Sequence, residues 1–560
     1  MNRPLRRNKD QNRLPESTGS TVVIGGDSVS SPSLWRSVIV LSLSVALVYL
    51  ALLFPSHPGK FGWSNWAQFP LELPVLILLL LAANQKIGRW LSLLLTLAIG
   101  LLLLLRLADL GSYLAFNRRF SPLLEIHLVA DGWNLASTAV GRFEAGIIVA
   151  VVFILLLALG FLLYRCLCTI SQVKGKTRTV SLGFVGVALL IGGTALAYEH
   201  RTHRDGPVEA NVIPEIALRI TSLQRSIADQ RTFTGELGLD NVMNVATPTF
   251  GALAGRDVIL VFVESYGRGY LDAERFSATA HSRLAKSEST LSESGLSVKS
   301  SWLTSPVRGG RSWLAQATLQ SGLEIDNQAR FDRLVTSDRL SLSGLFAQAG
   351  WYTTGIMPAI QLAWPEGVWY GYEGLYTNSE LGFSGERFGY VTMPDQYTLS
   401  HFENHIRQPS AKPMMATLAL LSTHAPWTPL PQKIDWELVG DGSIYDGSHR
   451  FGDPISWEYR EQVQDMYEKS FDYTLDILAE YAARYADDAL MIVVGDHQPP
   501  PIINGWGNSA DVPIHIISKD KFLLERLPAN EWVNGMLPDA DSPSQRMSSL
   551  RQTLSTLFEH

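Results

Sequence analysis

Five apolar runs lie within the first 200 residues, and they constrain the fold more than any other feature of the sequence. They are approximately Ser37–Phe54, Leu71–Ala83, Trp90–Leu105, Ala145–Tyr164 and Val180–Tyr198. Four of them are close to or longer than about 17 residues, the length that a helix needs to cross a bilayer. Leu71–Ala83 approaches this length together with its neighbours Phe69, Pro70 and Asn84. The sequence therefore predicts an N-terminal all-α transmembrane bundle of five helices over residues 35–198.

Cationic residues gather in three of the segments that flank these runs. The segments are the N-terminal tail (residues 1–34), the turn with Lys86 and Arg89, and the loop from Arg165 to Arg178. If the chain crosses the membrane five times, all three cation-rich segments lie on the same side of it. The positive-inside rule identifies this side as cytoplasmic. We expect a multi-pass protein of the inner or plasma membrane, with everything after Tyr198 exported. Ala195-Leu196-Ala197 has the form of a cleavage site, but small residues at a helix end explain it more simply.

Residues 199–255 are polar and contain one amphipathic helical pattern, Ile213–Gln230. This stretch predicts a linker that packs on the domain after it. The chain as a whole carries a net charge of −7. Because no basic surplus is available to neutralise a phosphate backbone, nucleic acid is excluded as a partner.

From residue 256 to residue 560 the sequence has the pattern of an α/β domain. Short, continuously apolar segments alternate with the helical patterns Ser312–Ser321, Ser341–Ala349 and Tyr459–Tyr485. Continuous apolarity indicates strands buried on both faces, as in a mainly parallel central sheet covered by helices. The predicted strands are Val258–Val263, Tyr352–Met357, Met415–Leu421 and Leu490–Val494.

Polar side chains follow three of these strands at the point where each strand ends. Glu264 follows the first, His424 lies just beyond the third, and Asp496 and His497 follow the fourth. Ligands of open α/β sheets bind beyond the carboxyl ends of the strands, so we expect these groups to share one site. Two carboxylates and an imidazole suit one divalent metal ion, with Mn²⁺ or Zn²⁺ favoured and Mg²⁺ an alternative.

Ser312 is the candidate nucleophile. It follows Arg308-Gly309-Gly310-Arg311 and opens the helical pattern Ser312–Ser321. A helix N-terminus presents unpaired N–H groups to a phosphate, a nearby metal would activate the hydroxyl, and Arg311 could face developing charge. The alternative is structural, because serine is also a favoured N-cap residue.

The order of these motifs resembles the alkaline phosphatase/sulfatase superfamily. With the preceding membrane helices, the layout resembles lipoteichoic acid synthase and related membrane phosphoglycerol transferases. The resemblance implies that the second half of the chain is a sulfatase-like domain. It also implies that Glu264, the Ser312 hydroxyl, Asp496 and His497 ligate the metal. Ser312 stands where that family has a nucleophilic threonine, and His424 matches a histidine that contacts the substrate headgroup or leaving group.

Two departures from the family pattern bear on the substrate. Trp364-Pro365-Glu366 stands where the polymer synthase has Trp-x-Arg, and a carboxylate beside an anionic headgroup is unfavourable. Trp364 is a candidate for stacking on a sugar or lipid headgroup, with packing against the core as the alternative. The sequence after Ser312 lacks the Pro and Arg of the sulfatase activation motif, which favours phosphodiester over sulfate ester chemistry.

These observations predict a membrane-anchored, metal-dependent phosphotransferase. It would move a phospho-headgroup from a membrane lipid to an envelope glycan or lipid acceptor through a covalent Ser312 intermediate. The alternatives are a sulfatase-like hydrolase of the envelope, acting on phosphodiesters or sulfuric esters, and an inactive envelope scaffold.

Overall fold

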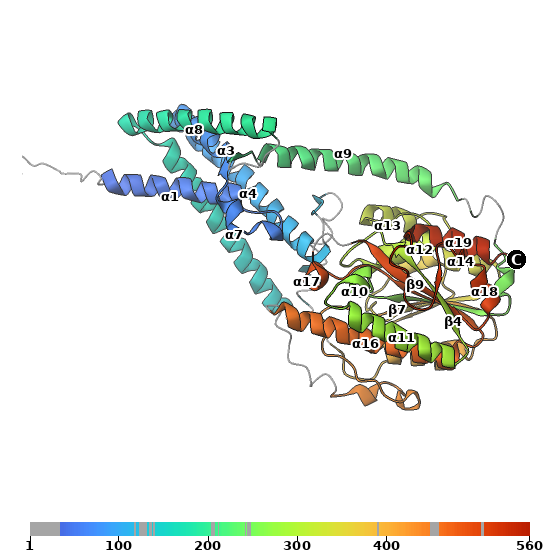
Figure 1. Ribbon diagram of the computed structural model, residues 1–560. Helices are drawn as coiled ribbons and strands as arrows, with labels where there is room; N and C mark the ends of the chain where they lie inside the picture. The colour runs from blue at the N-terminus through green and yellow to red at the C-terminus, as the bar shows by residue number, and fades with distance from the viewer. Residues whose placement is uncertain are drawn as a thin grey trace, which may run out of the picture.

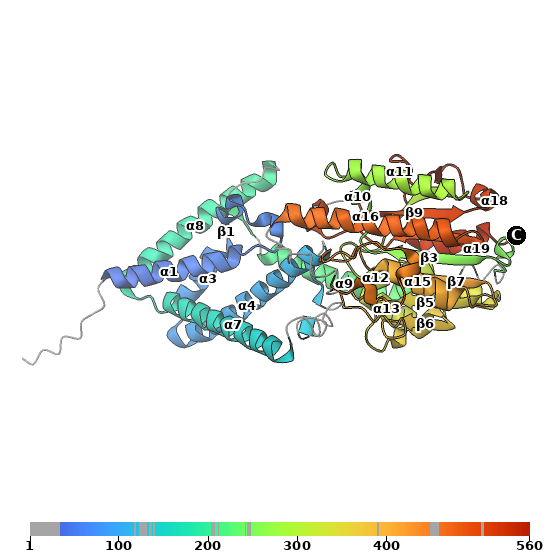
Figure 2. The same cartoon turned by 90° about the horizontal axis from the view of Figure 1, so that it is seen from below.

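The protein consists of an elongated helical bundle and a globular α/β unit, which the long helix α9 (Val212–Leu237) connects (Figure 1, Figure 2). The computed structural model describes residues 34–116, 119–122, 132–133, 137, 141–202, 208–210, 212–240, 242, 248–388, 391–447, 459–505 and 509–560. The predicted N-terminal tail, residues 1–34, lies outside these ranges except for Leu34.

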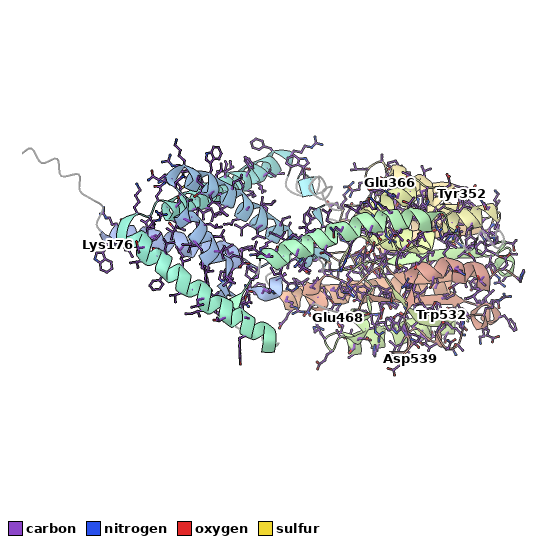
Figure 3. The ribbon with its side chains drawn as sticks, turned by 90° about the horizontal axis from the view of Figure 1, so that it is seen from above. Lys176, Tyr352, Glu366, Glu468, Trp532 and Asp539 are labelled. Carbon is purple, nitrogen blue, oxygen red and sulfur yellow. The ribbon has the colours of Figure 1, made fainter. Side chains whose placement is uncertain are left out.

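Four helices of the bundle are long and apolar enough to cross a membrane. They are α1 (Leu34–Leu53), α4 (Gln85–Phe116), α7 (Arg142–Ser171) and α8 (Gly175–Thr202). Most of their apolar side chains point outward, as they would against lipid. Figure 3 shows Lys176, near the start of α8, at the end of the bundle farthest from the globular unit.

The predicted run Leu71–Ala83 forms the shorter helix α3 (Glu72–Ala82). Its 11 residues rise about 16 Å, roughly half of the hydrocarbon thickness of a bilayer. The prediction of five membrane-crossing helices is therefore not confirmed; the described residues contain four such helices and this shorter one.

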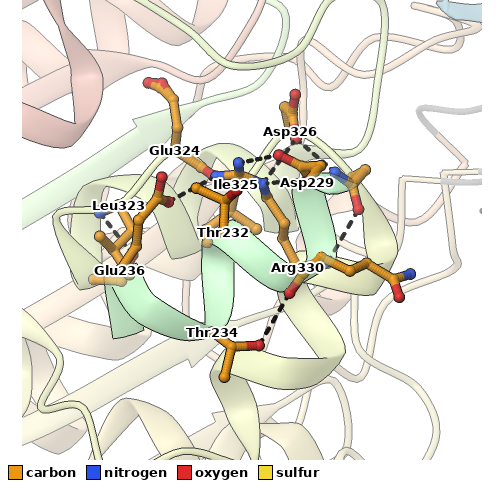
Figure 4. Close-up of polar contacts among 12 residues, drawn as sticks. Asp229, Thr232, Thr234, Glu236, Leu323, Glu324, Ile325, Asp326 and Arg330 are labelled. Carbon is orange, nitrogen blue, oxygen red and sulfur yellow. Dashed lines mark hydrogen bonds and ion pairs between the residues drawn. The ribbon is translucent and has the colours of Figure 1, made fainter. Parts of the chain in front are cut away.

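Helix α9 attaches to both parts of the molecule. Near its start, Glu215 accepts hydrogen bonds from Arg106 of α4. Towards its end, Asp229 and Glu236 pair with Arg330 of α13 (Gln328–Val335) (Figure 4). Phe233 of α9 is fully buried in the core of the globular unit. The amphipathic pattern Ile213–Gln230 thus forms a helix, which extends about two turns further and bridges the two parts.

A nine-stranded mixed sheet lies at the centre of the globular unit. Its strand order is β10-β4-β9-β8-β3-β7-β5-β6, with β11 beside β4. The run β8-β3-β7-β5-β6 is parallel, whereas β9 is antiparallel to both of its neighbours. The bounds are β3 (Asp257–Val263), β4 (Ser297–Thr304), β5 (Tyr352–Met357), β6 (Gly374–Thr377), β7 (Met414–Leu420), β8 (Ala489–Gly495), β9 (Asp511–Ser518), β10 (Val533–Asn534) and β11 (Gln545–Arg546). The four predicted strands are confirmed as β3, β5, β7 and β8, each within one residue at either end.

Helices cover both faces of the sheet, which explains the continuous apolar strands. In β3, Val261 and Val263 pack into the core under α11 (Ser277–Glu293) and α16 (Arg460–Tyr485), whereas Leu260 and Phe262 pack into the core on the other face. The second face carries α12 (Ser312–Ser321), α14 (Leu342–Gln348) and α19 (Leu550–Leu557) (Figure 1). Shorter helices are α10 (Arg268–Asp272), α15 (Asp395–His401), α17 (Pro501–Asn504) and α18 (Lys521–Glu525).

Candidate active site and metal centre

The site forms where two adjacent parallel strands end. Strands β3 and β8 pair in register up to Val263 and Gly495. Glu264 follows β3, and Asp496 and His497 follow β8, so strand pairing alone brings the three side chains to one edge of the sheet. Glu264 is 7% exposed, and Asp496 and His497 are each 1% exposed.

A turn of left-handed residues delivers Ser312 to the same edge. Gly309, Gly310 and Arg311 have φ angles of 66°, 127° and 68°. A side chain in this region costs about 1–3 kcal/mol, and such strain is typical of functional sites. Arg311 occupies the N-cap position of α12 and makes no side-chain cap bond. Ser312 is the first helical residue, so the structural alternative, that it serves as the N-cap, is wrong.

The four groups meet around one point. Ser312 Oγ donates a hydrogen bond to Glu264 Oε2 at 2.7 Å and lies 3.2 Å from His497 Nε2. That nitrogen is 3.3 Å from Glu264 Oε1 and 3.6 Å from Asp496 Oδ2. The ligand atoms of Glu264, Asp496 and His497 lie within 4.8 Å of one another. Side chains separated by up to 233 positions in the chain are therefore close enough to ligate a single ion.

Further hydrogen bonds orient these side chains. His497 Nδ1 lies 2.8 Å from the Gln498 carbonyl oxygen, which can only accept, so Nδ1 carries a proton and Nε2 is the nitrogen that faces the site. Asp496 Oδ1 accepts from the backbone N–H groups of Ser265 and His497 at 2.8 and 2.6 Å, which leaves Oδ2 for the site. Thr423 Oγ1 donates to the Glu264 backbone carbonyl at 2.7 Å and ties the ends of β7 and β3 together.

The charges at this site are unbalanced. Burial and the neighbouring charge of Glu264 raise the pKa of Asp496 to about 8. Burial opposes the charge on His497, but Asp496 and Glu264 outweigh it and raise the pKa of His497 to about 9. Burial also disfavours the charged form of Glu264 and by itself would raise the pKa of this carboxyl. The positive charges of His497 and His424 outweigh burial and bring the pKa of Glu264 well below the usual range. Two carboxylates thus compete for one imidazolium, and Asp496 takes up a proton.

This donor set fits a divalent cation. Two carboxylates, an imidazole nitrogen and a hydroxyl are the nitrogen and oxygen ligands that Zn²⁺ and Mn²⁺ accept in proteins. A cation would also neutralise the excess negative charge that raises the pKa of Asp496. Within the described ranges of the chain, no second cluster of three His, Cys, Asp or Glu residues could hold a metal ion.

A cavity of about 320 Å³ opens beside Ser312. The three predicted substrate-binding residues, Arg311, His424 and Trp364, all line it. Its remaining walls are mostly apolar, with contributions from Phe262, Met357, Ala359, Ile360, Ala419, Leu420 and Leu421. Trp364 also stacks obliquely on Tyr370, with ring centroids 5.2 Å apart, so it borders the cavity and packs on the core at once.

Sequence reasoning missed several residues around the site. Trp313 and Gln316 line the cavity, and Gln316 lies one helical turn after Ser312 on the same face of α12. Gln498 holds the Gly-rich turn against the end of β8, because its carbonyl accepts from the Gly309 N–H at 3.0 Å. The helical period points to Gln316 once Ser312 is chosen, whereas no sequence signal marks Gln498 as an orienting residue.

Known proteins provide similar structures but no sequence match. No protein-family profile and no curated protein matches the chain. Among solved structures, lipooligosaccharide phosphoethanolamine transferase A from Neisseria meningitidis, an integral membrane protein, aligns with 92% of this chain and 95% of its own length. That alignment has 12% identity and a TM-score of 0.44.

Two further solved structures align with a little over half of this chain. The lipoteichoic acid synthase LtaP from Listeria monocytogenes shares 11% identity at a TM-score of 0.38, with 56% of this chain and 74% of LtaP aligned. The C-terminal periplasmic domain of EcEptC from Escherichia coli, in complex with Zn, shares 14% identity at a TM-score of 0.37. In that case 55% of this chain and 82% of the EcEptC domain align.

Proposed function

We propose that this protein is a membrane-anchored, metal-dependent phosphotransferase. It would transfer a phospho-headgroup from a membrane lipid to an envelope glycan or second lipid. The observation that carries the proposal is the convergence of a hydroxyl, two carboxylates and an imidazole at the mouth of a cavity. This arrangement suits an activated serine that attacks phosphorus and is regenerated in a second step.

In the first step, Ser312 Oγ attacks the phosphorus of a lipid phosphodiester, and the bond from phosphorus to the diacylglycerol oxygen breaks. The Oγ proton, which hydrogen-bonds to Glu264 Oε2 at 2.7 Å, is released to water as the serine alkoxide forms, and His424 supplies a proton to the leaving oxygen. In the second step, an acceptor hydroxyl attacks phospho-Ser312 and gives its proton to His424, while Ser312 Oγ leaves as the alkoxide and recovers a proton from water. A divalent cation held by Glu264, Asp496 and His497 would supply charge stabilisation and lower the pKa of the hydroxyl.

A lipid donor is supported by the walls of the cavity. Arg311 is 7% exposed and brings one cationic group to the cavity, beside Ser312. Opposite this polar part, Met357, Ile360 and Leu421 offer apolar surface that a sugar phosphate would leave unused. A phosphodiester joined to a glyceride matches both parts, because its anionic and apolar groups are neighbours.

The path of the chain through the bundle supports an extracytoplasmic active site. Arg106 donates to the Leu52 carbonyl at 2.7 Å, so α1 ends at the level of Arg106 and α9. Arg36 at the start of α1 lines a cavity with Lys174 at the opposite end of the bundle. There Gly88 of α4 lies against Ser171 of α7, so α4 begins at this end of the bundle and runs back towards Arg106. The cationic end, by the positive-inside rule, is cytoplasmic, and the globular unit lies on the other side.

The test is a search for the covalent intermediate. Full-length protein is incubated with envelope lipids and Mn²⁺ or Zn²⁺, and peptides that contain Ser312 are analysed by mass spectrometry. We expect a phosphate-bearing adduct on Ser312, whose mass also identifies the transferred group. Ser341→Ala is a matched control, because Ser341 is a true N-cap on α14 and lies outside the site. An adduct on another residue, or none during turnover, would remove Ser312 from the mechanism.

Product analysis separates transfer from hydrolysis. A transferase releases diacylglycerol only as the modified acceptor accumulates, whereas a hydrolase needs only water. Release of the headgroup at full rate without an acceptor would favour the envelope hydrolase. Absence of both metal binding and turnover would favour the inactive scaffold.

A further inference from the structure

A second cavity of about 320 Å³ lies where the bundle meets α9. The end of α1, the segment after it, α4 and the first turns of α9 all contribute. Its lining consists of Leu53, Phe54, Pro55, Ser56, Lys60, Asn65, Arg106, Arg119, Ala210, Pro214, Glu215 and Leu218. None of these residues belongs to the site around Ser312.

A buried ion pair forms the floor of this cavity. Arg106, 4% exposed, donates through Nε and one terminal nitrogen to Glu215 Oε2 at 3.0 and 2.8 Å. Its other terminal nitrogen donates to the carbonyl oxygens of Leu52 and Phe54 at 2.7 and 2.8 Å. Each nitrogen of the Arg106 side chain therefore has a partner, and the side chain holds α1, α4 and α9 together.

Cations outnumber carboxylates around this floor. Asp109, which is fully buried, pairs with Arg219 at 2.7 Å and lies 3.7 Å from Arg119. Arg219 also pairs with Glu215 at 2.9 Å. Among the described residues of this cluster there are thus four cations and two carboxylates. The cations are Lys60, Arg106, Arg119 and Arg219, and the carboxylates are Asp109 and Glu215. The surplus of two positive charges lies on the cavity side, with Arg119 and the exposed Lys60.

The surroundings of this surplus are apolar. Leu53, Phe54 and Leu218 form part of the cavity wall. The residues directly after Arg106 and Glu215, namely Leu107 and Ile216, are 46% and 49% exposed. Charged residues on a helix long enough to cross the membrane mark functional positions, because their desolvation is costly. An anion that enters this cavity would have apolar neighbours at the level of the membrane surface.

We propose that this cavity binds the phosphate headgroup of an anionic membrane lipid. Arg119 and Lys60 contact the phosphate, Arg106 contributes its charge from the floor, and the acyl chains lie along the apolar faces of α4 and α9. The far end of α9 pairs with Arg330 of the globular unit through Asp229 (Figure 4). A lipid bound at the start of α9 would therefore help to hold the globular unit close to the bilayer. This site is separate from the donor site proposed at Ser312.

The test measures lipid binding without turnover. Full-length Ser312→Ala protein is stripped of metal with EDTA in zwitterionic detergent, which removes consumption of the lipid and weakens phosphate binding at the metal centre. Dihexanoyl phosphatidylglycerol, dihexanoyl phosphatidylcholine and inorganic phosphate are titrated calorimetrically. We expect phosphatidylglycerol to bind more tightly than the other two, with an affinity that falls as salt is added.

Variants locate the binding. Each cation near the membrane surface raises the affinity for an anionic lipid about 5-fold. Lys60→Gln should therefore lower the affinity for phosphatidylglycerol about 5-fold, and Lys60→Gln/Arg119→Gln about 30-fold. Lys176→Gln/Arg178→Gln, at the other end of the bundle, is the matched control and should change nothing. The exposed Lys60 allows a decisive single variant if loss of the Arg119–Asp109 contact impairs folding.

Two results would overturn the proposal. Unchanged phosphatidylglycerol affinity in correctly folded Lys60→Gln would remove this cavity as the site. Equally tight binding of inorganic phosphate would refute the lipid assignment in favour of a free anion. Neither result would touch the proposed phosphotransfer, since the readout requires neither metal nor Ser312.

Discussion

The molecule contains two buried groups of charge that are built in opposite ways: the Arg106–Glu215 pair and the cluster around His497. At the junction of bundle and α9, Arg106 donates two hydrogen bonds to Glu215 and two to the carbonyl oxygens of Leu52 and Phe54, and the surplus cations Lys60 and Arg119 lie outside this pair. At the sheet edge, Glu264 and Asp496 crowd around His497, and Asp496 resolves the conflict by taking up a proton. A balanced pair holds elements together, whereas an unbalanced cluster requires a partner that the chain does not supply. The Arg106–Glu215 pair therefore suits a structural role, and the cluster around His497 suits the ion binding that we propose.

The largest expected effect is on chemistry at the sheet edge. Ser312→Ala should lower turnover more than about 10³-fold, because removal of a covalent nucleophile eliminates the two-step pathway. Thermal unfolding should change little, since Ser312 caps no helix. Ser341→Ala should do the reverse, losing about 1 kcal/mol of stability with its cap and keeping activity. Substantial turnover by Ser312→Ala would contradict the mechanism.

Changes to the Arg106–Glu215 pair should alter stability. Arg106→Gln leaves Glu215 with Arg219 as its remaining partner and removes the hydrogen bonds to Leu52 and Phe54, so the loss should be near the lower end of the cost of breaking a buried ion pair, about 3 kcal/mol. Thermal unfolding of the full-length protein in detergent should report this loss, while metal content stays unchanged. Arg89→Gln, an exposed arginine on the same helix, is the control and should be neutral. Equal stability of the two variants would mean that the Arg106 pair has no structural role.

Removal of one carboxyl from the cluster around His497 should have opposite effects on the metal-free and the metal-bound protein. In the metal-free protein Asp496 must take up a proton on folding, and asparagine avoids this cost, so Asp496→Asn should make the metal-free protein more stable near pH 7. The same change should weaken Mn²⁺ or Zn²⁺ binding about 100-fold, since changes around metal ligands already cost 10- to 100-fold. Metal analysis and thermal unfolding with and without EDTA measure both, with Asp472→Asn on α16 as control. Unchanged metal affinity would place the ion elsewhere.

The smallest effect is a dependence of stability on pH in the metal-free protein. Asp496 has its pKa raised to about 8 in the fold, so the folded state binds more protons than the unfolded chain between roughly pH 4 and 8. His497, with its pKa raised to about 9, contributes stability below its ordinary value that is lost as the pH rises. Both groups therefore make the unfolding temperature fall as the pH is raised from 5 to 9. Added Zn²⁺ should flatten this decline, and a rising curve in EDTA would contradict the charge assignment.

Strands that are apolar along their whole length were predictable, and those that bury polar groups were not. Strand β4 contains Ser300 and Ser301, whose hydroxyls donate to the carbonyl oxygens of Gly535 and Glu531. Strand β9 contains His515, which is fully buried between Tyr266 and Ser300. Without knowledge of these distant partners, polar residues in a short segment favour a loop over a buried strand.

The site itself was predictable in its members and not in its geometry. Glu264, Asp496 and His497 could be chosen because residues after buried parallel strands share one edge of the sheet. Ser312 was ambiguous between nucleophile and N-cap, and only the left-handed turn at Arg311 decided which way its hydroxyl points. The charge cluster around Arg106 and Glu215 had no sequence signal, because 109 residues separate its partners.

The sequence by itself determined the apolar membrane helices, the parallel core of the sheet and the residue types at its edge. These follow from local patterns of burial, which each segment carries within itself. Tertiary structure alone decided that four side chains close on one point and that cations exceed carboxylates beside α9. Such properties depend on distances between segments far apart in the chain, and local hydrophobicity does not encode them.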